Sequence, residues 1–126
     1  MARHAQPIQI DAVVLQQYVD ALGSIGWQAE GGIIRPVYSA AWVQAREQVA
    51  EWMRAAGLEV RGDAVGNLFG RLRGRDVSRT ILTGSHLDTG PLGGKFDGAL
   101  GIRAGLGALR GLQRTWLESP CDSSRG

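Results

Sequence analysis

Residues 83–101, TGSHLDTGPLGGKFDGALG, place one histidine and two aspartates among closely spaced glycines and join two segments of different pattern. Upstream, RTILTGSH (79–86) is a short, mainly apolar run, which predicts a strand. Downstream, GALGIRAGLGALRGL (98–112) has apolar residues at helical spacing but many glycines. Because each glycine costs a helix about 1 kcal/mol relative to alanine, we expect this helix to pack closely against a sheet.

Two further helices are predicted before this stretch. Residues 10–27, IDAVVLQQYVDALGSIGW, have apolar residues at near-helical spacing, with Asp11 as a plausible N-cap and Gly23 as a plausible end. Residues 39–56 form one apolar stripe, which Ser39 can cap and Gly57 can end.

The apolar pattern then changes period. Residues 58–74, LEVRGDAVGNLFGRLRG, alternate apolar and polar residues around Gly66 and Asn67, which predicts a β-hairpin or two short strands. The resulting order of two helices, strands, a loop and a further helix is typical of an α/β layer architecture.

Bulk properties describe an ordinary globular chain. It has 126 residues, the size of one domain, with 44% apolar and 21% charged residues and a net charge of +2. MARHAQPIQ (1–9) reads as a tail without the features of a signal peptide, and no apolar run reaches the length of a membrane span. The single cysteine, Cys121, fits a reducing compartment. We therefore expect a cytoplasmic protein without a membrane partner.

The carboxyl-terminal segment 113–126, QRTWLESPCDSSRG, departs from the preceding pattern. Apolar periodicity stops at Leu112, and proline, serine and glycine follow. We interpret these residues as an aberrant tail, of the kind that a frameshift or read-through produces.

The three polar residues of the glycine-rich stretch suggest metal chemistry. His86 would lie at the end of a strand, where open α/β sheets bind ligands. Asp88 is close enough to accept a hydrogen bond from the ring nitrogen that does not face a metal, and the carboxylate of Asp97 could bridge two cations. The alternative is a strand-to-helix turn whose polar residues cap the backbone and face solvent.

A second alternative is an aspartic protease. Asp88-Thr89-Gly90 is the triplet found in such enzymes, and a chain of this length could supply one aspartate to a dimer. That architecture is nearly all β, whereas helical patterns flank the triplet here.

A third alternative is a nucleic-acid-binding module. Arg71, Arg73, Arg75 and Arg79 cluster in one segment, and clustered arginines can contact phosphates. The segment lacks interleaved aromatic residues, however, and alternating arginines are also typical of a solvated strand face.

The segment GSHLDTGPLGGKFDGALG (84–101) closely resembles the active-site segment of the amidase/hydantoinase/carbamoylase branch of the zinc-dependent M20-type metallohydrolases. The likeness covers about residues 10–112. It implies the N-terminal portion of a zinc-peptidase-like catalytic domain, with helices packed on a mixed β-sheet and the lid and dimerisation domain absent. Members of this branch include N-carbamoyl-L-amino acid hydrolases, allantoate amidohydrolases and one class of β-ureidopropionases.

The resemblance also implies roles for individual residues. His86 would bind one metal, Asp97 would bridge two, and Asp88 would be the orienting catalytic acid. The family uses two divalent ions, usually zinc and sometimes manganese, with a glutamate base, and releases ammonia and carbon dioxide from small ureido substrates. The parent would be a homodimer without a nucleic-acid partner.

This chain alone lacks much of such a site. Zinc takes about four ligands, whereas the only other histidine is His4, and Glu118 has none of the flanking residues expected of the base. We therefore expect a fragment that is inactive by itself.

Overall fold

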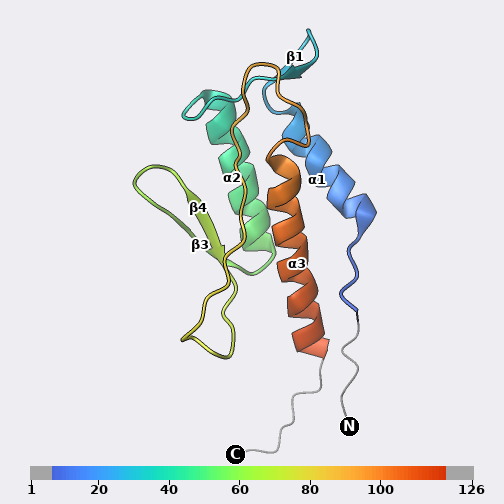
Figure 1. Cartoon of the computed structure of the whole chain (residues 1–126), viewed down its shortest axis with the longest axis vertical. Coiled ribbons are helices and arrows are strands. Elements are labelled where there is room, and N and C mark those ends of the chain that lie inside the picture. The colour runs from blue at the N-terminus through green and yellow to red at the C-terminus, as the bar shows by residue number, and fades with distance from the viewer. Residues whose placement is uncertain (1–6, 119–126) are drawn as a thin grey trace, which may run out of the picture.

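Three helices lie side by side in the described part of the chain, with a β-hairpin beside the second (Figure 1). The computed structural model describes residues 7–118, and Cys121 and His4 therefore lie outside the described residues. The elements in chain order are α1 (Ala12–Ser24), β1 (Trp27–Gln28), β2 (Gly32–Ile33), α2 (Ala40–Ala55), β3 (Glu59–Gly62), β4 (Leu68–Arg71) and α3 (Ala99–Glu118). This combination of helices and strands confirms the predicted α/β class.

The first two helices begin at the predicted caps. The Oδ1 atom of Asp11 accepts hydrogen bonds from the amides of Val13 and Val14 at 3.0 and 3.1 Å. The Oγ atom of Ser39 accepts one from the amide of Trp42 at 3.2 Å. Each cap satisfies amides that the first helical turn leaves without a partner.

The ends of these helices follow different rules. Gly57, with a φ of 74°, follows α2 in the left-handed conformation that favours glycine, as predicted. Gly23 was expected to end the first helix, but it lies buried inside α1, which continues to Ser24. Glycine suits this position because the helix face lies close to Lys95. The Cβ atom of Lys95 is 3.2 Å from where a Cβ atom of residue 23 would lie.

The predicted hairpin is confirmed. Strands β3 and β4 pair antiparallel, with Glu59 opposite Arg71 and Gly62 opposite Leu68. In the turn, the Oδ1 atom of Asp63 accepts hydrogen bonds from the amides of Val65 and Asn67 at 3.1 and 2.8 Å. The side chain of Asp63 therefore holds the turn that the sequence pattern indicated.

The other strand pair is short and anchors a loop. Strands β1 and β2 pair antiparallel, and Ile33 of β2 also exchanges two backbone hydrogen bonds with Gly93, each 2.9 Å long. The loop before α3 is thereby attached to the segment that follows α1.

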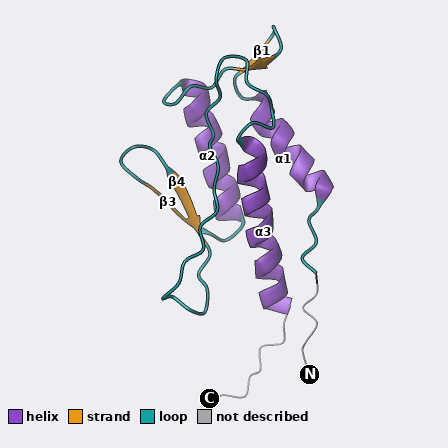
Figure 2. Cartoon of the chain, viewed as in Figure 1, coloured by secondary structure: helices purple, strands orange, loops and turns teal. Residues whose placement is uncertain are grey.

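The strand predicted for residues 79–86 is not present. These residues run as an extended segment without strand pairing, shown as loop in Figure 2. The side chains of Ile81 and Leu82 are 97% and 80% exposed. An apolar, β-branched run favours a strand, but a strand also needs a neighbour with which to hydrogen-bond. Within residues 7–118 the paired strands are two antiparallel pairs, so the mixed sheet is not seen there.

The glycines of α3 provide the close approach that their number predicted, although the contact is with this extended segment. A Cβ atom on Gly101 would lie 2.7 Å from the Cβ of Ser85, and one on Gly105 would lie 3.3 Å from Cγ2 of Thr83. The helix therefore has small residues where the chain crosses it.

The last helix is longer than predicted. It was expected to end at Leu112 but continues to Glu118. The polar residues after Leu112 are compatible with a helix, and Pro120, which cannot continue one, lies two residues beyond its end. Residues 119–126 lie outside the described part of the chain.

The core is formed where the three helices meet. Buried side chains from α1, the residue after it, α2 and α3 form one apolar cluster of Leu22, Ile25, Ala45, Val49 and Ala99.

No helix in residues 7–118 is long and apolar enough to cross a membrane.

Candidate metal centre

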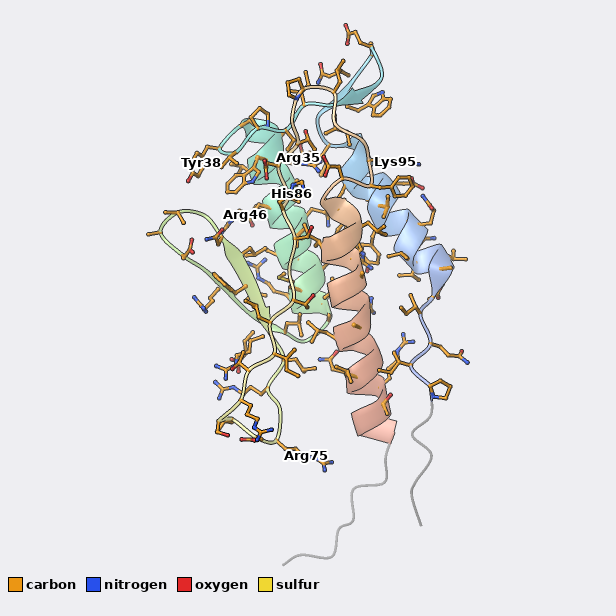
Figure 3. All side chains as sticks on the ribbon, viewed as in Figure 1. Arg35, Tyr38, Arg46, Arg75, His86 and Lys95 are labelled. Atoms are coloured by element: carbon orange, nitrogen blue, oxygen red, sulfur yellow. The ribbon has the colours of Figure 1, made fainter. Side chains whose placement is uncertain are left out.

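His86, Asp88 and Asp97 lie together in the structure. His86 and Asp88 belong to the extended segment that crosses α3, and Asp97 lies two residues before the first residue of that helix. Figure 3 shows His86 beside α2, near Arg35. All three candidate side chains are about half exposed, so a ligand from solvent can reach them.

The imidazole of His86 contacts both aspartates. Its Nε2 atom lies 3.1 Å from Oδ1 of Asp97. Its Nδ1 atom lies 2.9 Å from the main-chain oxygen of Asp88 and 3.5 Å from Oδ1 of the same residue. The sequence pointed to the carboxylate of Asp88 as the orienting group, whereas its main-chain carbonyl is the closer partner.

These contacts determine which ring nitrogen of a neutral His86 carries the proton. A carbonyl oxygen only accepts hydrogen bonds, so Nδ1 must carry the proton that it donates to Asp88. In a neutral ring Nε2 then presents its lone pair to the carboxylate of Asp97. The lone pair of Nε2 and the negative carboxylate of Asp97 then face each other. A cation between them, or a proton on Nε2, stabilises this arrangement.

The donor pair has the dimensions of a metal site. Zinc–nitrogen and zinc–oxygen bonds are about 2.0–2.2 Å long, so two ligands on one tetrahedral ion lie roughly 3.4 Å apart. The 3.1 Å between Nε2 of His86 and Oδ1 of Asp97 is slightly shorter than this spacing, and it is also the length of a direct hydrogen bond. Within residues 7–118, however, no group of three or more His, Cys, Asp or Glu side chains converges to hold a metal. These residues therefore fit part of a metal site.

Arg35 supports the loop that bears these residues, although the sequence reasoning did not single it out. It is 1% exposed. Its Nε atom donates to the carbonyl of Leu87 at 2.8 Å, and its Nη1 atom donates to the carbonyls of Leu22 and Ile25 at 2.8 and 3.0 Å. Burial lowers the pKa of Arg35, and the nearby charge of Asp88 acts in the opposite direction. The sequence signal that could have indicated its burial is its position after two isoleucines and before a proline.

Thr89 completes this attachment. Its Oγ1 atom donates to the carbonyl of Ile33 at 2.9 Å and accepts from the amide of Arg35 at 3.0 Å. Its own amide donates to the carbonyl of Arg35 at 3.0 Å. Buried hydrogen bonds therefore hold the Asp88-Thr89-Gly90 triplet against the residues that follow β2.

Gly98 allows the turn between Asp97 and α3. Its φ of 70° lies in the left-handed region. A Cβ atom at this position would overlap the carbonyl oxygen of His86. The absence of a side chain at Gly98 therefore lets Asp97 approach His86.

Lys95 contacts α1 from the same loop. Its Nζ atom lies 3.1 Å from Oδ1 of Asp20, and Figure 3 shows Lys95 beside α1, away from His86. A hydrogen bond from Gln16, together with the one from Lys95, lowers the pKa of Asp20. This contact gives Lys95 a structural role.

A groove of about 560 Å³ adjoins the candidate centre. His86 and Asp88 line it together with apolar residues of α2, the hairpin and α3, among them Trp42, Met53 and Leu106. The two polar side chains therefore lie at the wall of a largely apolar groove.

The arginine-rich segment is partly neutralised. Arg73 forms a 2.7 Å ion pair with Glu59, which raises the pKa of Arg73. Arg79 lies 4.0 Å from Asp76. Two of the four clustered arginines thus have acidic partners, which weakens the case for a phosphate-binding surface.

No protein-family model matches the sequence. Individual known proteins, however, are similar to it in sequence and structure. Allantoate amidohydrolase of Bacillus subtilis is 43% identical over 103 residues, which are 81% of this chain and 25% of that protein. An N-carbamoyl-L-amino acid amidohydrolase of Geobacillus stearothermophilus is 46% identical over 93 residues, 73% of this chain and 23% of the relative. A hydantoinase/carbamoylase family amidase of Burkholderia ambifaria superposes with a TM-score of 0.83 at 39% identity, over 88% of this chain and 28% of that one.

The chain is homologous to the hydantoinase/carbamoylase family of amidases. This confirms the resemblance that the glycine-rich stretch indicated. The chain spans about a quarter of the length of its relatives in this carbamoylase family.

Proposed function

We propose that this chain is part of a metal-dependent amidohydrolase that acts on N-carbamoyl-L-amino acids or related ureido compounds, with His86 and Asp97 as metal ligands. The observation that carries the proposal is the 3.1 Å approach of Nε2 of His86 to Oδ1 of Asp97. The names of the relatives, allantoate amidohydrolase and N-carbamoyl-L-amino acid amidohydrolase, support the reaction class.

The residues of the candidate metal centre have distinct roles in this proposal. The carbonyl of Asp88 holds the proton on Nδ1 of His86 and so keeps Nε2 free to bind an ion. The carboxylate of Asp97 has two oxygens and would hold both ions. Two divalent ions, zinc or manganese, would supply an acidified water and polarise the substrate carbonyl. Arg35 and Gly98 set the distance between the ligands.

The names of the relatives support a ureido substrate. Allantoate and N-carbamoyl amino acids are both ureido compounds, in which hydrolysis cleaves a linear C–N bond. We place N-carbamoyl-L-amino acids first, with allantoate and N-carbamoyl-β-alanine as alternatives. The full-length parent would work as a homodimer in the cytoplasm.

A chimeric enzyme tests the proposal. Residues 10–112 would replace the matching segment of the Geobacillus stearothermophilus relative, and ammonia release from N-carbamoyl-L-amino acids and allantoate would be measured. We expect metal-dependent turnover that His86→Ala and Asp97→Ala each reduce by at least about a hundredfold, whereas Glu51→Gln, an exposed substitution on α2, leaves it unchanged. A folded chimera whose activity survives both alanine substitutions would contradict the assignment of these ligands.

The isolated chain provides a second test. With zinc or manganese and N-carbamoyl-L-amino acids it should release no ammonia above a metal-only control, because residues 7–118 bring together no more than a part of the ligands that two ions need. Metal-dependent turnover by the chain alone, lost in Asp97→Ala, would instead indicate a self-sufficient site, completed by association between chains.

A further inference from the structure

Arg103 of α3 is a buried cation without an acidic partner. Its side chain is 2% exposed, and its Cζ atom lies 3.2 Å from the centroid of the Tyr18 ring and 5.3 Å from that of Trp52. Within residues 7–118, its Nε and Nη1 atoms have no hydrogen-bond partner. Burial lowers the pKa of Arg103 to about 10, Tyr18 acts in the opposite direction, and the like charge of Arg110 lowers the pKa further.

The aromatic rings leave the Nε and Nη1 atoms of Arg103 without acceptors. A ring stacked on a guanidinium interacts with its flat face, whereas all five N–H donors point outward in the plane of the group. Acceptors are therefore needed at the edge of the guanidinium. Buried donors without acceptors are rare in native proteins and commonly indicate an unobserved water or ion.

A small cavity lies beside this guanidinium, on the opposite side of α3 from the extended segment that bears His86. It has a volume of about 90 Å³ and is lined by Arg103, Arg110 and Arg114 together with Gly107 and Gly111. Arg103, Gly107, Arg110 and Arg114 recur at intervals of three and four along α3, and Gly111 lies four residues after Gly107, so the five residues share one face of the helix. A Cβ atom on Gly107 would meet nothing within 4 Å, so the missing side chain leaves this space open.

The charges around the cavity are strongly unbalanced. Asp11 is the acidic residue among its lining residues, and its Oδ1 atom already accepts from the amides of Val13 and Val14. None of the ion pairs found in the described part of the chain involves Arg103, Arg110 or Arg114. Arg110 donates instead to the hydroxyl of Tyr18 over 3.4 Å. Three arginines thus line this space, and the one acidic residue among its lining residues already accepts two backbone hydrogen bonds.

We propose that this cavity between α1 and α3 binds a small oxyanion, a phosphate or a carboxylate, through Arg103, Arg110 and Arg114. Oxyanions accept charge-assisted hydrogen bonds from guanidinium groups, often two at a time. The bound anion would supply the acceptors that Arg103 lacks and offset the repulsion among the three arginines. The site is separate from the candidate metal centre and does not depend on the proposed enzymatic function.

Anion binding would be measured on the whole chain with inorganic phosphate and, separately, acetate. Thermal unfolding would be followed at constant ionic strength with sodium chloride as the balancing salt, and phosphorus NMR line width would report direct binding. We expect saturable stabilisation by at least one of the two oxyanions beyond the chloride control. The oxyanion that stabilises the chain more, tetrahedral phosphate or planar acetate, identifies the shape of anion that the site favours.

Three variants locate the effect. Arg103→Met removes the buried charge, Gly107→Leu fills the cavity while keeping all three arginines, and Arg114→Gln removes an exposed charge at its edge. Each should weaken anion affinity about tenfold or more, because each removes charged hydrogen bonds or the space for the ligand. Arg75→Gln, in the distant loop that Figure 3 labels, removes the same charge as a control and should change nothing.

Two results would overturn the proposal. The first is a wild-type chain that neither oxyanion stabilises beyond the chloride control, which would leave water as the occupant of the cavity. The second is stabilisation that persists in Gly107→Leu and Arg114→Gln, since this would place the anion elsewhere. Should Arg103→Met fail to fold, these two variants still decide the question.

Discussion

The Nε atom of Arg35 donates a hydrogen bond to the carbonyl of Leu87 at 2.8 Å, although the two residues are 52 positions apart in sequence. Leu87 lies between His86 and Asp88, so this bond fixes the backbone that presents both candidate side chains. The same guanidinium binds two carbonyls at the end of α1. A single buried side chain therefore connects the first helix to the candidate metal centre.

Replacing Arg35 with methionine should destabilise the protein. The substitution keeps much of the apolar volume but leaves the carbonyls of Leu22, Ile25 and Leu87 without their donor. We expect a loss of about 2–3 kcal/mol in the free energy of unfolding, measured by urea denaturation. Arg54→Met, on the exposed surface of α2, is the control and should cost much less. Equal losses in the two variants would show that the buried hydrogen bonds contribute nothing specific.

Metal binding to the chain should depend on His86 and Asp97. Titration calorimetry with Zn²⁺ should show weak binding that His86→Ala or Asp97→Ala abolishes, because each removes one of the two facing donors. Asp88→Asn should weaken binding by about tenfold, at the lower end of the 10–100-fold range for such partners, because the main-chain carbonyl of residue 88 remains. His4→Ala, which removes the other imidazole of the chain, should have no effect.

Gly98→Ala should be costly, whereas Gly94→Ala should be tolerated. Gly98 has a φ of 70°, and a Cβ atom there would overlap the backbone of His86. We expect a loss of about 1–3 kcal/mol in unfolding free energy and weaker metal binding. A Cβ atom on Gly94 meets nothing within 4 Å, so this variant is a matched control in the same loop. If both variants were equally stable, the close approach would not be a constraint.

The hairpin turn should weaken in acid. A hydrogen bond from the Asn67 side chain, with further backbone amides, lowers the pKa of Asp63 below the usual 3.8. A depressed carboxyl pKa contributes stability that is present above the ordinary value and is lost as pH falls through the folded-state pKa. Between about pH 5 and pH 2 the wild type should therefore lose stability that Asp63→Asn does not lose. Asn67→Ala removes the main donor, and its stability should depend less on pH in the same window.

The exposed apolar run at residues 79–86 should promote association between chains. Ile81 is 97% exposed, in an extended segment whose backbone has no strand pairing in the structure. Unpaired extended backbone with apolar side chains tends to pair with other chains. Ile81→Lys should therefore reduce light scattering at high protein concentration. Val77→Lys changes another exposed apolar residue, 70% exposed and outside this run, and should have a smaller effect. Equal reductions would point to net charge instead.

Local interactions made several elements predictable from sequence. Asp11 and Ser39 cap their helices through hydrogen bonds to amides two or three residues away, and Gly57 follows α2 with a positive φ. The Asp63–Asn67 turn is equally local. His86 and Asp88 are neighbours in sequence, whereas Asp97 is eleven residues from His86, in a loop that Ile33 and Arg35 also hold. For the caps and the hairpin turn the interacting groups lie within a few residues, so the sequence alone contains the relevant chemistry.

Long-range packing decided the rest. The sequence pattern of residues 79–86 predicted a strand, but strand pairing depends on a neighbour that the segment itself does not specify. Arg103 looks like an ordinary surface cation in the sequence, and the apolar neighbours of Arg35 are only a weak signal. The approach of α1 to distant segments shows that both side chains are buried. The closer orienting partner of His86 is a main-chain carbonyl, which residue identity cannot reveal. The residue types and local hydrogen bonds thus came from the sequence, whereas burial and main-chain contacts were set by which surfaces meet, because a side chain is desolvated only when distant parts of the chain cover it.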